Sequence, residues 1–504
     1  MPVTGKPGKI AKMDRRRFLT RTVSGAAALS ARGSVGWPLA LGVPVAQIPG
    51  KSLAGAPARG PLKVHPANPR YFTDGRGQPV FLTGSHTWAG LQDMGLPPLR
   101  PFAWHEFLDM LLEHNHNCTK LWIWLQAEGG PWTDDHIRFG PLPYLRTGPG
   151  TAIDGKPKFD LTRFNEQLFE RLRTRAIEAG DRGVYVCIQL FLPGASEKRG
   201  GPCDPWPGHP YNLRNNINGF DGERRGTSTV DLDRPEVRAT QAAYMRKVID
   251  TVRDLDNVLF EAVGEGGRRD WDWWVVDYVH SYEKNKRKQH PVGLSGGGAE
   301  SLAEMLASPA DWVGAGWNDG PFKTDPPAWD GKKVSILDTD HIWGHGGTAS
   351  WAWKCFLRGH NTWLMDPWSP LPGRPCGEVN WLARPGAPGR DVNRREHWTW
   401  EPVRMAMGNT RSYALRINLA SMTPRGELAS TDYCLANPPW EYLAYLPEGD
   451  EVTLDLRDSS GTMAVEWMHP VEGSIVRGGT VTGGANENFA VPFSGAAVLY
   501  VKKV

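Results

Sequence analysis

The chain has 504 residues, and its 58 Lys and Arg nearly balance its 55 Asp and Glu, which leaves a formal net charge of +3. This length is too great for one small core and favours one large domain with an appendage, or several ordinary domains. The charge balance argues against nucleic acid as the main partner, and the lack of a run of about 18 apolar residues argues against a membrane span.

The start of the chain resembles an export signal. Residues 14–20 read Asp-Arg-Arg-Arg-Phe-Leu-Thr, close to the twin-arginine pattern, and a weakly apolar stretch follows at 23–31. Residues 54–56 have the small-x-small form of a cleavage site. We therefore assign residues 1–56 to a leader and expect a periplasmic or secreted protein, the alternative being a basic disordered tail.

Strand-like and helix-like patterns alternate over residues 62–425. Helical spacing of apolar residues appears around 164–172, 244–252 and 274–282, between short apolar runs. Strands that are regularly followed by helices favour a parallel sheet, and eight such units favour a closed (β/α)8 barrel over a doubly wound open sheet. The predicted strands are 80–84, 119–125, 184–191, 258–263, 292–295, 312–317, 334–338 and 362–365, preceded by a hairpin at 64–79.

Helical patterns disappear in the last part of the chain. Short strand patterns separated by Gly, Pro, Asp and Ser turns predict a small β-sandwich over residues 426–504. Its predicted strands are 441–445, 451–456, 463–467, 479–481, 489–492 and 497–501.

The six cysteines lie far apart, without C-x-x-C spacing, which indicates neither zinc nor a redox pair. Cys118 and Cys187 lie in apolar runs and are interpreted as buried thiols. Cys203 and Cys376 lie in loops rich in Gly and Pro, where they could pair.

Carboxylates follow two predicted strands that would face each other across the barrel mouth. Glu261 and Glu265 have the same parity on the fourth strand, which places Glu265 at the rim and Glu261 deeper. Asp338 ends the seventh strand. Cleavage of a glycosidic bond needs two carboxyl groups, one to protonate the leaving oxygen and one to attack or to activate water. We predict that Glu265 and Asp338 are this pair.

Aromatic and polar side chains gather at the same strand ends. The chain has 23 Trp, and sugars pack their flat C–H faces on indole rings while their hydroxyls need fixed polar partners. Some of these residues will only pack in the core or cap their own turns. The predicted substrate contacts are His86, Trp88, Trp122, Trp124, Glu128, Gln189, His209, Asn212, Glu261, Trp317, His341, Asp366 and Trp368.

The sequence lacks the motifs of metal-dependent, serine-nucleophile and phosphate-binding sites. The histidines form no H-E-x-x-H pair, no G-x-S-x-G elbow occurs, and the glycine run at 296–298 is not followed by G-K-[ST]. We predict a carbohydrate substrate, no metal and no cofactor, and leave the oligomeric state open. Two alternatives remain, a polysaccharide lyase that uses Arg214 and His209, and a non-catalytic protein that binds carbohydrate or matrix.

Several motifs resemble one family. Residues 257–265 read Asn-Val-Leu-Phe-Glu-Ala-Val-Gly-Glu and resemble the strand-4 signature of the retaining clan of (β/α)8 glycoside hydrolases that includes cellulase-like enzymes. The motifs at 86–88, 121–124, 209–212 and 338–341 resemble cellulase-like barrels related to apiosidases. Segments 432–437 and 493–500 resemble the C-terminal β-domain of those proteins, which carries a collagen-binding label.

The resemblance implies that Glu265 is the general acid/base and that a strand-7 carboxylate is the nucleophile, Asp338 first and Asp340 as the alternative. This sequence departs from the clan at two places. Gly264 replaces an Asn whose amide usually holds the sugar 2-hydroxyl, and strand 7 offers Asp where the clan has Glu. The shorter Asp side chain leaves both a retaining and an inverting mechanism open.

Overall fold

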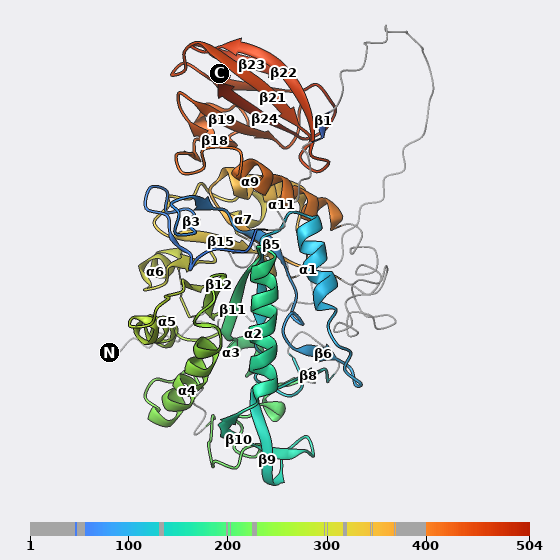
Figure 1. Cartoon of the computed structure of the whole chain (residues 1–504), viewed down its shortest axis with the longest axis vertical. Coiled ribbons are helices and arrows are strands. Elements are labelled where there is room, and N and C mark those ends of the chain that lie inside the picture. Colours follow the sequence, from blue (N-terminus) through green and yellow to red (C-terminus); the bar gives the residue numbers. More distant parts are fainter. Residues whose placement is uncertain are drawn as a thin grey trace, which may run out of the picture. The chain divides into compact units, whose positions relative to one another are not determined.

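Eight parallel strands of the described chain form a barrel (Figure 1). The barrel closes where the backbone N–H of Asn117 donates to the carbonyl of Thr83 over 2.9 Å, between the first and second strands. The predicted (β/α)8 fold is confirmed. In chain order the strands are β5 (Thr83–His86), β7 (Cys118–Trp122), β11 (Tyr185–Phe191), β12 (Val258–Val263), β13 (Val292–Leu294), β14 (Trp312–Val313), β15 (Val334–Asp338) and β16 (Asn361–Met365).

The structure is a computed structural model. It describes residues 46–47, 56–130, 136–197, 200–201, 203–223, 229–296, 298–299, 301–315, 320–342, 344, 346–366, 368 and 400–504. The twin-arginine segment, Trp317 and Cys376 lie outside these residues.

Helices cover the outside of the barrel. In α2 (Glu166–Asp181) the apolar side chains Leu168, Leu172 and Ala176 are spaced by four residues and are fully buried against the sheet. The helical spacing in the sequence thus corresponds to α2, α4 and α5. The helices are α1 (Trp104–Glu113), α3 (Pro193–Ser196), α4 (Pro235–Val252), α5 (Arg269–Glu283), α6 (Leu302–Ala307), α7 (Pro321–Thr324), α8 (Thr339–Ile342), α9 (Ala349–Leu357) and α11 (Glu401–Ala414), with 3-10 turns η2 (Trp206–Gly208) and η5 (Gly426–Leu428).

The segment before the barrel differs from the predicted hairpin. It forms a three-stranded antiparallel sheet from β2 (Lys63–Val64), β3 (Phe72–Thr73) and β4 (Pro79–Val80). The first barrel strand consequently begins at Thr83 rather than at residue 80. The apolar run that predicts one strand is divided between β4 and β5, a break that apolar periodicity does not mark.

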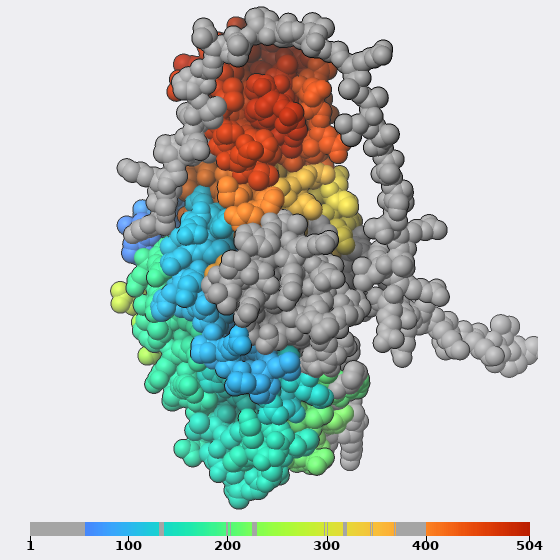
Figure 2. Space-filling view, turned by 90° about the vertical axis from the view of Figure 1, so that its right-hand side faces the viewer, coloured from blue at the N-terminus to red at the C-terminus, as the bar shows by residue number. Residues whose placement is uncertain are grey.

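The loops after β5 and β7 form two strand pairs that the sequence patterns do not predict. β6 (Asp93–Gly95) pairs with β8 (Arg138–Gly140), and β9 (Tyr144–Thr151) pairs with β10 (Pro157–Phe164). Most side chains of β9 are partly or fully exposed, so this strand lacks the apolar alternation that reveals a half-buried strand. Figure 2 shows the teal β9–β10 segment at the surface.

Two antiparallel sheets form the C-terminal region. The larger contains β1 (Ala46–Gln47), β17 (Thr423–Pro424), β18 (Cys434–Asn437), β19 (Glu441–Leu446), β21 (Thr462–Met468), β22 (Ser474–Thr482) and β24 (Ala497–Lys503), and the smaller pairs β20 (Glu451–Asp455) with β23 (Asn486–Ala490). Apolar side chains of both sheets share one core. The strand β1 comes from the segment that we assign to the leader.

The larger sheet packs on helices α9 and α11 of the barrel. Trp353 of α9 stacks on Tyr445 of β19 with 6.1 Å between ring centroids, and its indole N–H donates to the carbonyl of Pro470 over 3.0 Å. Tyr413 of α11 meets Tyr500 of β24 edge to face. None of the described helices has the length and hydropathy that a membrane span requires.

Candidate active site

A buried lysine joins two carboxylates inside the barrel. Lys120 of β7 places Nζ 2.7 Å from Oδ2 of Asp338 on β15 and 2.9 Å from Oε2 of Glu261 on β12. All three side chains are at most 1% exposed. The ammonium group also lies 4.7 Å from the ring centroid of Trp122. One cation therefore connects the second, fourth and seventh strands of the barrel.

The two carboxyl groups of this cluster differ in protonation. Burial, helped by the charge of Asp338, raises the pKa of Glu261 to about 7 against the opposing charge of Lys120. Burial also acts to raise the pKa of Asp338, but His86 and Lys120 outweigh it and hold that pKa well below its ordinary value. Asp338 is thus a permanent anion, whereas Glu261 changes its charge near neutral pH.

The second oxygen of Asp338 is occupied as well. The indole N–H of Trp122 donates to Nδ1 of His86 over 3.3 Å, and because indole is only a donor, the proton of this imidazole lies on Nε2. Nε2 of His86 then donates to Oδ1 of Asp338 over 2.9 Å. The backbone N–H of Asp340 donates to the same oxygen over 3.0 Å. Asp338 therefore orients its neighbours, with both oxygens bound.

A second carboxyl group follows directly in the chain. The turn made by Asp338 and the backbone of Asp340 starts the short helix α8, and it brings Asp340 to the rim of the barrel. Carboxyl oxygens of Glu265 and Asp340 and a ring nitrogen of His341 all lie within 4.8 Å of one another. Glu265 is exposed, while the side chains of Asp340 and His341 are only 7% and 5% exposed.

Electrostatics distinguish the members of this group. Burial, followed by the charges of Asp338 and Glu265, raises the pKa of Asp340 well above its ordinary value. Burial lowers the pKa of His341 to about 4, so that its imidazole is neutral at neutral pH. Nε2 of His341 has no hydrogen-bond partner among the described residues. The group thus combines an exposed carboxyl group, a buried carboxyl group whose ionisation is disfavoured, and an uncharged imidazole.

Most of the predicted aromatic contacts that the structure describes are packed in the core. Trp122 and Trp124 are stacked with 5.7 Å between centroids and are 2% and 1% exposed, and the indole N–H of Trp124 donates to the carbonyl of Trp88. Trp88 itself is partly buried. Trp368 packs against Phe102 and Phe107 in the core.

Several predicted polar contacts are held by protein partners. Arg404 of α11 binds both oxygens of Asp366 over 2.6 and 2.7 Å, and Glu128 pairs with Arg138 over 3.2 Å. Asn212 closes its own turn through Trp206 and Arg214.

His209 stacks on Trp206, with 5.1 Å between centroids, and its Nδ1 accepts from the backbone N–H of Tyr211. Gln189 behaves differently, because neither atom of its buried amide has a hydrogen-bond partner among the described residues.

Two residues of this region were not predicted as part of the site. Lys120 is the single cation in the apolar run Cys118–Trp122, and its parity matches Trp122, which would have pointed to a charge inside the barrel. Gln126 follows the same strand and is fully buried, with both amide atoms unpartnered among the described residues.

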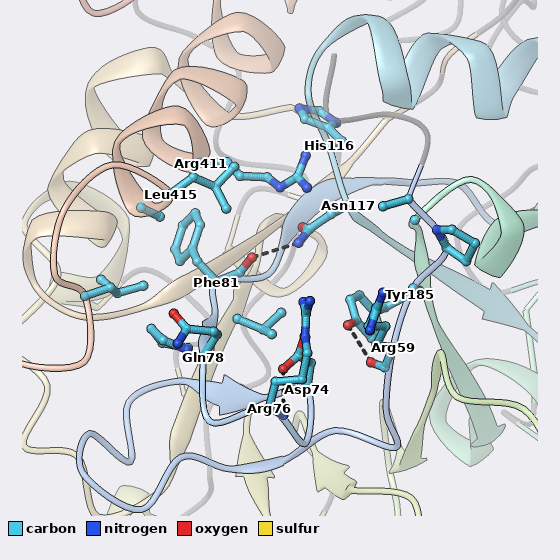
Figure 3. Close-up of a pocket in the computed structure, with 18 of the residues that line it drawn as sticks. Arg59, Asp74, Arg76, Gln78, Phe81, His116, Asn117, Tyr185, Arg411 and Leu415 are labelled. Carbon is cyan, nitrogen blue, oxygen red and sulfur yellow. Dashed lines mark hydrogen bonds and ion pairs between the residues drawn. The ribbon is translucent and has the colours of Figure 1, made fainter. Parts of the chain in front are cut away.

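A hollow of about 490 Å³ lies at the opposite end of the barrel (Figure 3). It is lined by residues at the strand starts, such as Phe81, Asn117 and Tyr185. Two of its polar contacts lie within the lining: the amide of Asn117 donates to the carbonyl of Phe81, and Asp74 binds Arg76. Asp74 is the one carboxylate among its described lining residues. The described lining of this hollow therefore offers no pair of carboxyl groups.

Comparison with known proteins relates the barrel to glycoside hydrolases. One solved structure, described as a glycoside hydrolase, has a TM-score of 0.55 at 12% identity and covers 88% of this chain and 97% of that chain. Another, a glycoside hydrolase family 5 protein from Bacteroides vulgatus ATCC 8482, has a TM-score of 0.56 at 13% identity, with 88% and 93% covered. The chain shares their fold. Identity this low shows the fold alone.

A family model described as a domain of unknown function, DUF6298, matches residues 132–299, about a third of the chain. The matched segment contains Glu261 and Glu265 and ends before Asp338. No curated protein matches the chain.

Proposed function

We propose that the protein is a retaining glycoside hydrolase whose catalytic carboxyl groups are Glu265 and Asp340. The observation that carries this proposal is the approach of their oxygens to within 4.8 Å of each other at the barrel rim. Carboxyl groups about 5–5.5 Å apart are typical of retaining enzymes, whereas inverting enzymes need about 6.5–9.5 Å to admit a water. The short separation therefore favours a double displacement.

In the first step Glu265 protonates the leaving oxygen while Asp340 attacks the anomeric carbon. The bond between that carbon and the leaving oxygen breaks as the bond to Asp340 forms. In the second step the ionised Glu265 takes a proton from water, whose oxygen attacks the same carbon and releases Asp340. The roles follow the clan that the sequence resembles, with Asp340 in place of Asp338.

Asp338 is the less suitable nucleophile. Both of its oxygens are bound, one by Lys120 and the other by His86 and the backbone of Asp340. An attack would break these contacts and leave Lys120 with less compensation inside the barrel. We infer that Asp338 positions Asp340 and keeps a fixed negative charge beneath it.

We propose that the pair shares one proton in the free site. Burial, followed by the charges of Asp338 and Glu265, raises the pKa of Asp340, so a negative charge on Glu265 disfavours ionisation of Asp340. Catalysis requires this proton on Glu265 and an ionised Asp340. We propose that the proton passes from Asp340 to Glu265 as the sugar fills the space between them.

The substrate is a carbohydrate, and the mechanism needs no cofactor. A panel of polysaccharides and aryl glycosides, including apiosides because of the family resemblance, tests this directly. Release of reducing sugar or of the aryl group is expected from the native protein and not from Glu265→Gln or Asp340→Asn. An unsaturated product that absorbs in the near ultraviolet would instead identify a lyase, and binding without cleavage, including binding to collagen, would indicate a non-catalytic protein.

Azide distinguishes the two roles. Without its acid/base a retaining enzyme still forms the glycosyl-enzyme, so Glu265→Ala with azide should yield a glycosyl azide of retained configuration. Asp340→Ala should yield the azide of inverted configuration, because azide then attacks the substrate itself. The opposite pattern would exchange the roles, and inverted hydrolysis product from the native enzyme would overturn the retaining mechanism. The exposed carboxylate variant Glu170→Gln is the control.

A further inference from the structure

Gln189 presents an unsatisfied amide inside the barrel. It lies on β11, in register with Trp122 of β7 and Glu261 of β12, so that its side chain has the same interior orientation. The residue is 1% exposed, and neither Nε2 nor Oε1 has a hydrogen-bond partner among the described residues. Buried amides are nearly always paired in native proteins, so an unpaired one beside reactive groups indicates a place for a ligand.

The position of this amide is defined by Gly264, which directly precedes Glu265. A Cβ atom on Gly264 would lie 1.9 Å from Nε2 and 3.0 Å from Cδ of Gln189. The backbone of Gly264 is not in the left-handed region, so its conformation does not require glycine. In this structure the amide of Gln189 occupies the space that a side chain of residue 264 would take, so such a side chain would displace the amide.

This observation gives a physical reason for one departure from the resembled clan. There an Asn at this position supplies an amide from the fourth strand, whereas here Gly264 supplies none. Gln189 brings an amide to the same place from the third strand. The amide also offers both a donor and an acceptor, the two partners that a hydroxyl group uses.

We propose that Gln189 binds the sugar hydroxyl next to the reacting carbon, the 2-hydroxyl, and so positions the sugar between Glu265 and Asp340. The inference rests on the proposed glycosidase function. Hydrogen bonds to this hydroxyl strengthen in the transition state of glycoside cleavage. Loss of the amide should therefore lower kcat more than it raises KM.

The test uses the full chain and the aryl glycoside of the panel that it cleaves fastest, together with the 2-deoxy counterpart of that glycoside. Gln189→Leu, which keeps most of the volume without the amide, is expected to lower kcat/KM about 100-fold on the first substrate. On the 2-deoxy substrate the kcat/KM of the same variant should differ less than about threefold from that of the native protein. Equal losses on both substrates would show a structural role and overturn the proposal.

A second pair of variants moves the amide back to the fourth strand. Gly264→Asn alone should lose activity, because the new side chain meets Gln189. The double variant Gly264→Asn/Gln189→Gly lacks the obstructing amide of Gln189. Its kcat/KM should be at least about tenfold higher than that of Gln189→Gly alone. If Gly264→Asn changes kcat/KM by the same factor in the native protein and in Gln189→Gly, Gln189 does not occupy that place and the proposal fails.

The control separates this proposal from the function on which it rests. Glu265→Gln should abolish cleavage of both substrates, whereas Gln189→Leu should affect only the one with a 2-hydroxyl. If the native protein cleaves no glycoside, the proposed function and this inference both fail. If it cleaves glycosides and Gln189→Leu does not discriminate between the substrates, this inference alone fails.

Discussion

Lys120 and Asp338 form an ion pair inside the barrel, with 2.7 Å between Nζ and Oδ2. The same ammonium group lies 2.9 Å from Glu261. Because Asp338 in turn accepts from the backbone of Asp340, the buried cluster fixes the start of α8, on which the proposed nucleophile lies. The charges beneath the rim therefore determine both where Asp340 lies and how readily it ionises.

Replacement of Lys120 by Met should destabilise the fold. The substitution leaves Asp338 and Glu261 buried without their cation, and breaking a buried pair in this way costs about 3–5 kcal/mol. Chemical unfolding monitored by Trp fluorescence measures the free energy of unfolding. Lys247→Met removes a surface pair with Glu166 and should cost less than about 1 kcal/mol. Similar values for the two variants would contradict a structural role of the buried cluster.

The barrel is largely predictable from the sequence, whereas the contacts of its charged residues are not. Most barrel strands coincide with or overlap an apolar run, and the predicted strands 258–263 and 334–338 have the bounds of β12 and β15. The partner of Asp366 is Arg404, which comes from a helix 38 residues later in the chain. Spacing along the sequence carries no information on such a pair.

The choice between Asp338 and Asp340 as the second catalytic carboxylate also depends on contacts that the sequence does not reveal. The end of the predicted strand and the strand-7 pattern of the resembled clan favour Asp338 over Asp340, and both residues are present in the sequence. Asp338 is bound because a lysine of the second strand points at the seventh across the barrel interior. That contact depends on the closure of the sheet, which single-sequence patterns do not specify in atomic detail.

Substitutions of Asp340 and of Asp338 should have different effects on activity. Asp340→Asn removes the proposed nucleophile and should lower kcat by more than about 1000-fold, a loss expected when a covalent step is blocked. Asp338→Asn keeps the shape of the side chain and should retain measurable turnover. Single-turnover kinetics on one aryl glycoside, with folding checked by circular dichroism, provide the measurement. Greater loss in Asp338→Asn than in Asp340→Asn would assign the nucleophile to Asp338.

Asp338→Asn should also shift the pH profile. After burial, the charge of Asp338 is the next cause of the raised pKa of Asp340, so its removal lowers that pKa. The limb of kcat/KM that requires an ionised Asp340 should move to lower pH by about one unit. The profile is recorded from acid to mildly alkaline pH, with Glu170→Gln as the control. An unchanged limb would show that Asp338 does not influence this ionisation.

Glu261 should make the fold less stable as the pH rises. Its pKa is about 7 in the folded state against an ordinary value of 4.5, so the folded state binds the proton more tightly. The associated stability is fully present below pH 4.5 and is lost as the pH rises through 7, by roughly 2–3 kcal/mol. Glu261→Gln cannot ionise, so this decline should disappear in urea unfolding at pH 5 and pH 8. An identical decline in the variant would exclude Glu261 as its source.

A divalent metal should inhibit the protein without being required by it. Glu265, Asp340 and His341 offer two oxygens and one nitrogen within 4.8 Å, a set that suits Zn²⁺. We expect Zn²⁺ to inhibit glycoside cleavage, EDTA to reverse the inhibition, and EDTA alone to leave the activity unchanged, because the proposed steps use the carboxyl groups only. Mg²⁺, which prefers oxygen ligands in octahedral geometry, should inhibit far less. Activity that EDTA abolishes and Zn²⁺ restores would instead make this group a catalytic metal site.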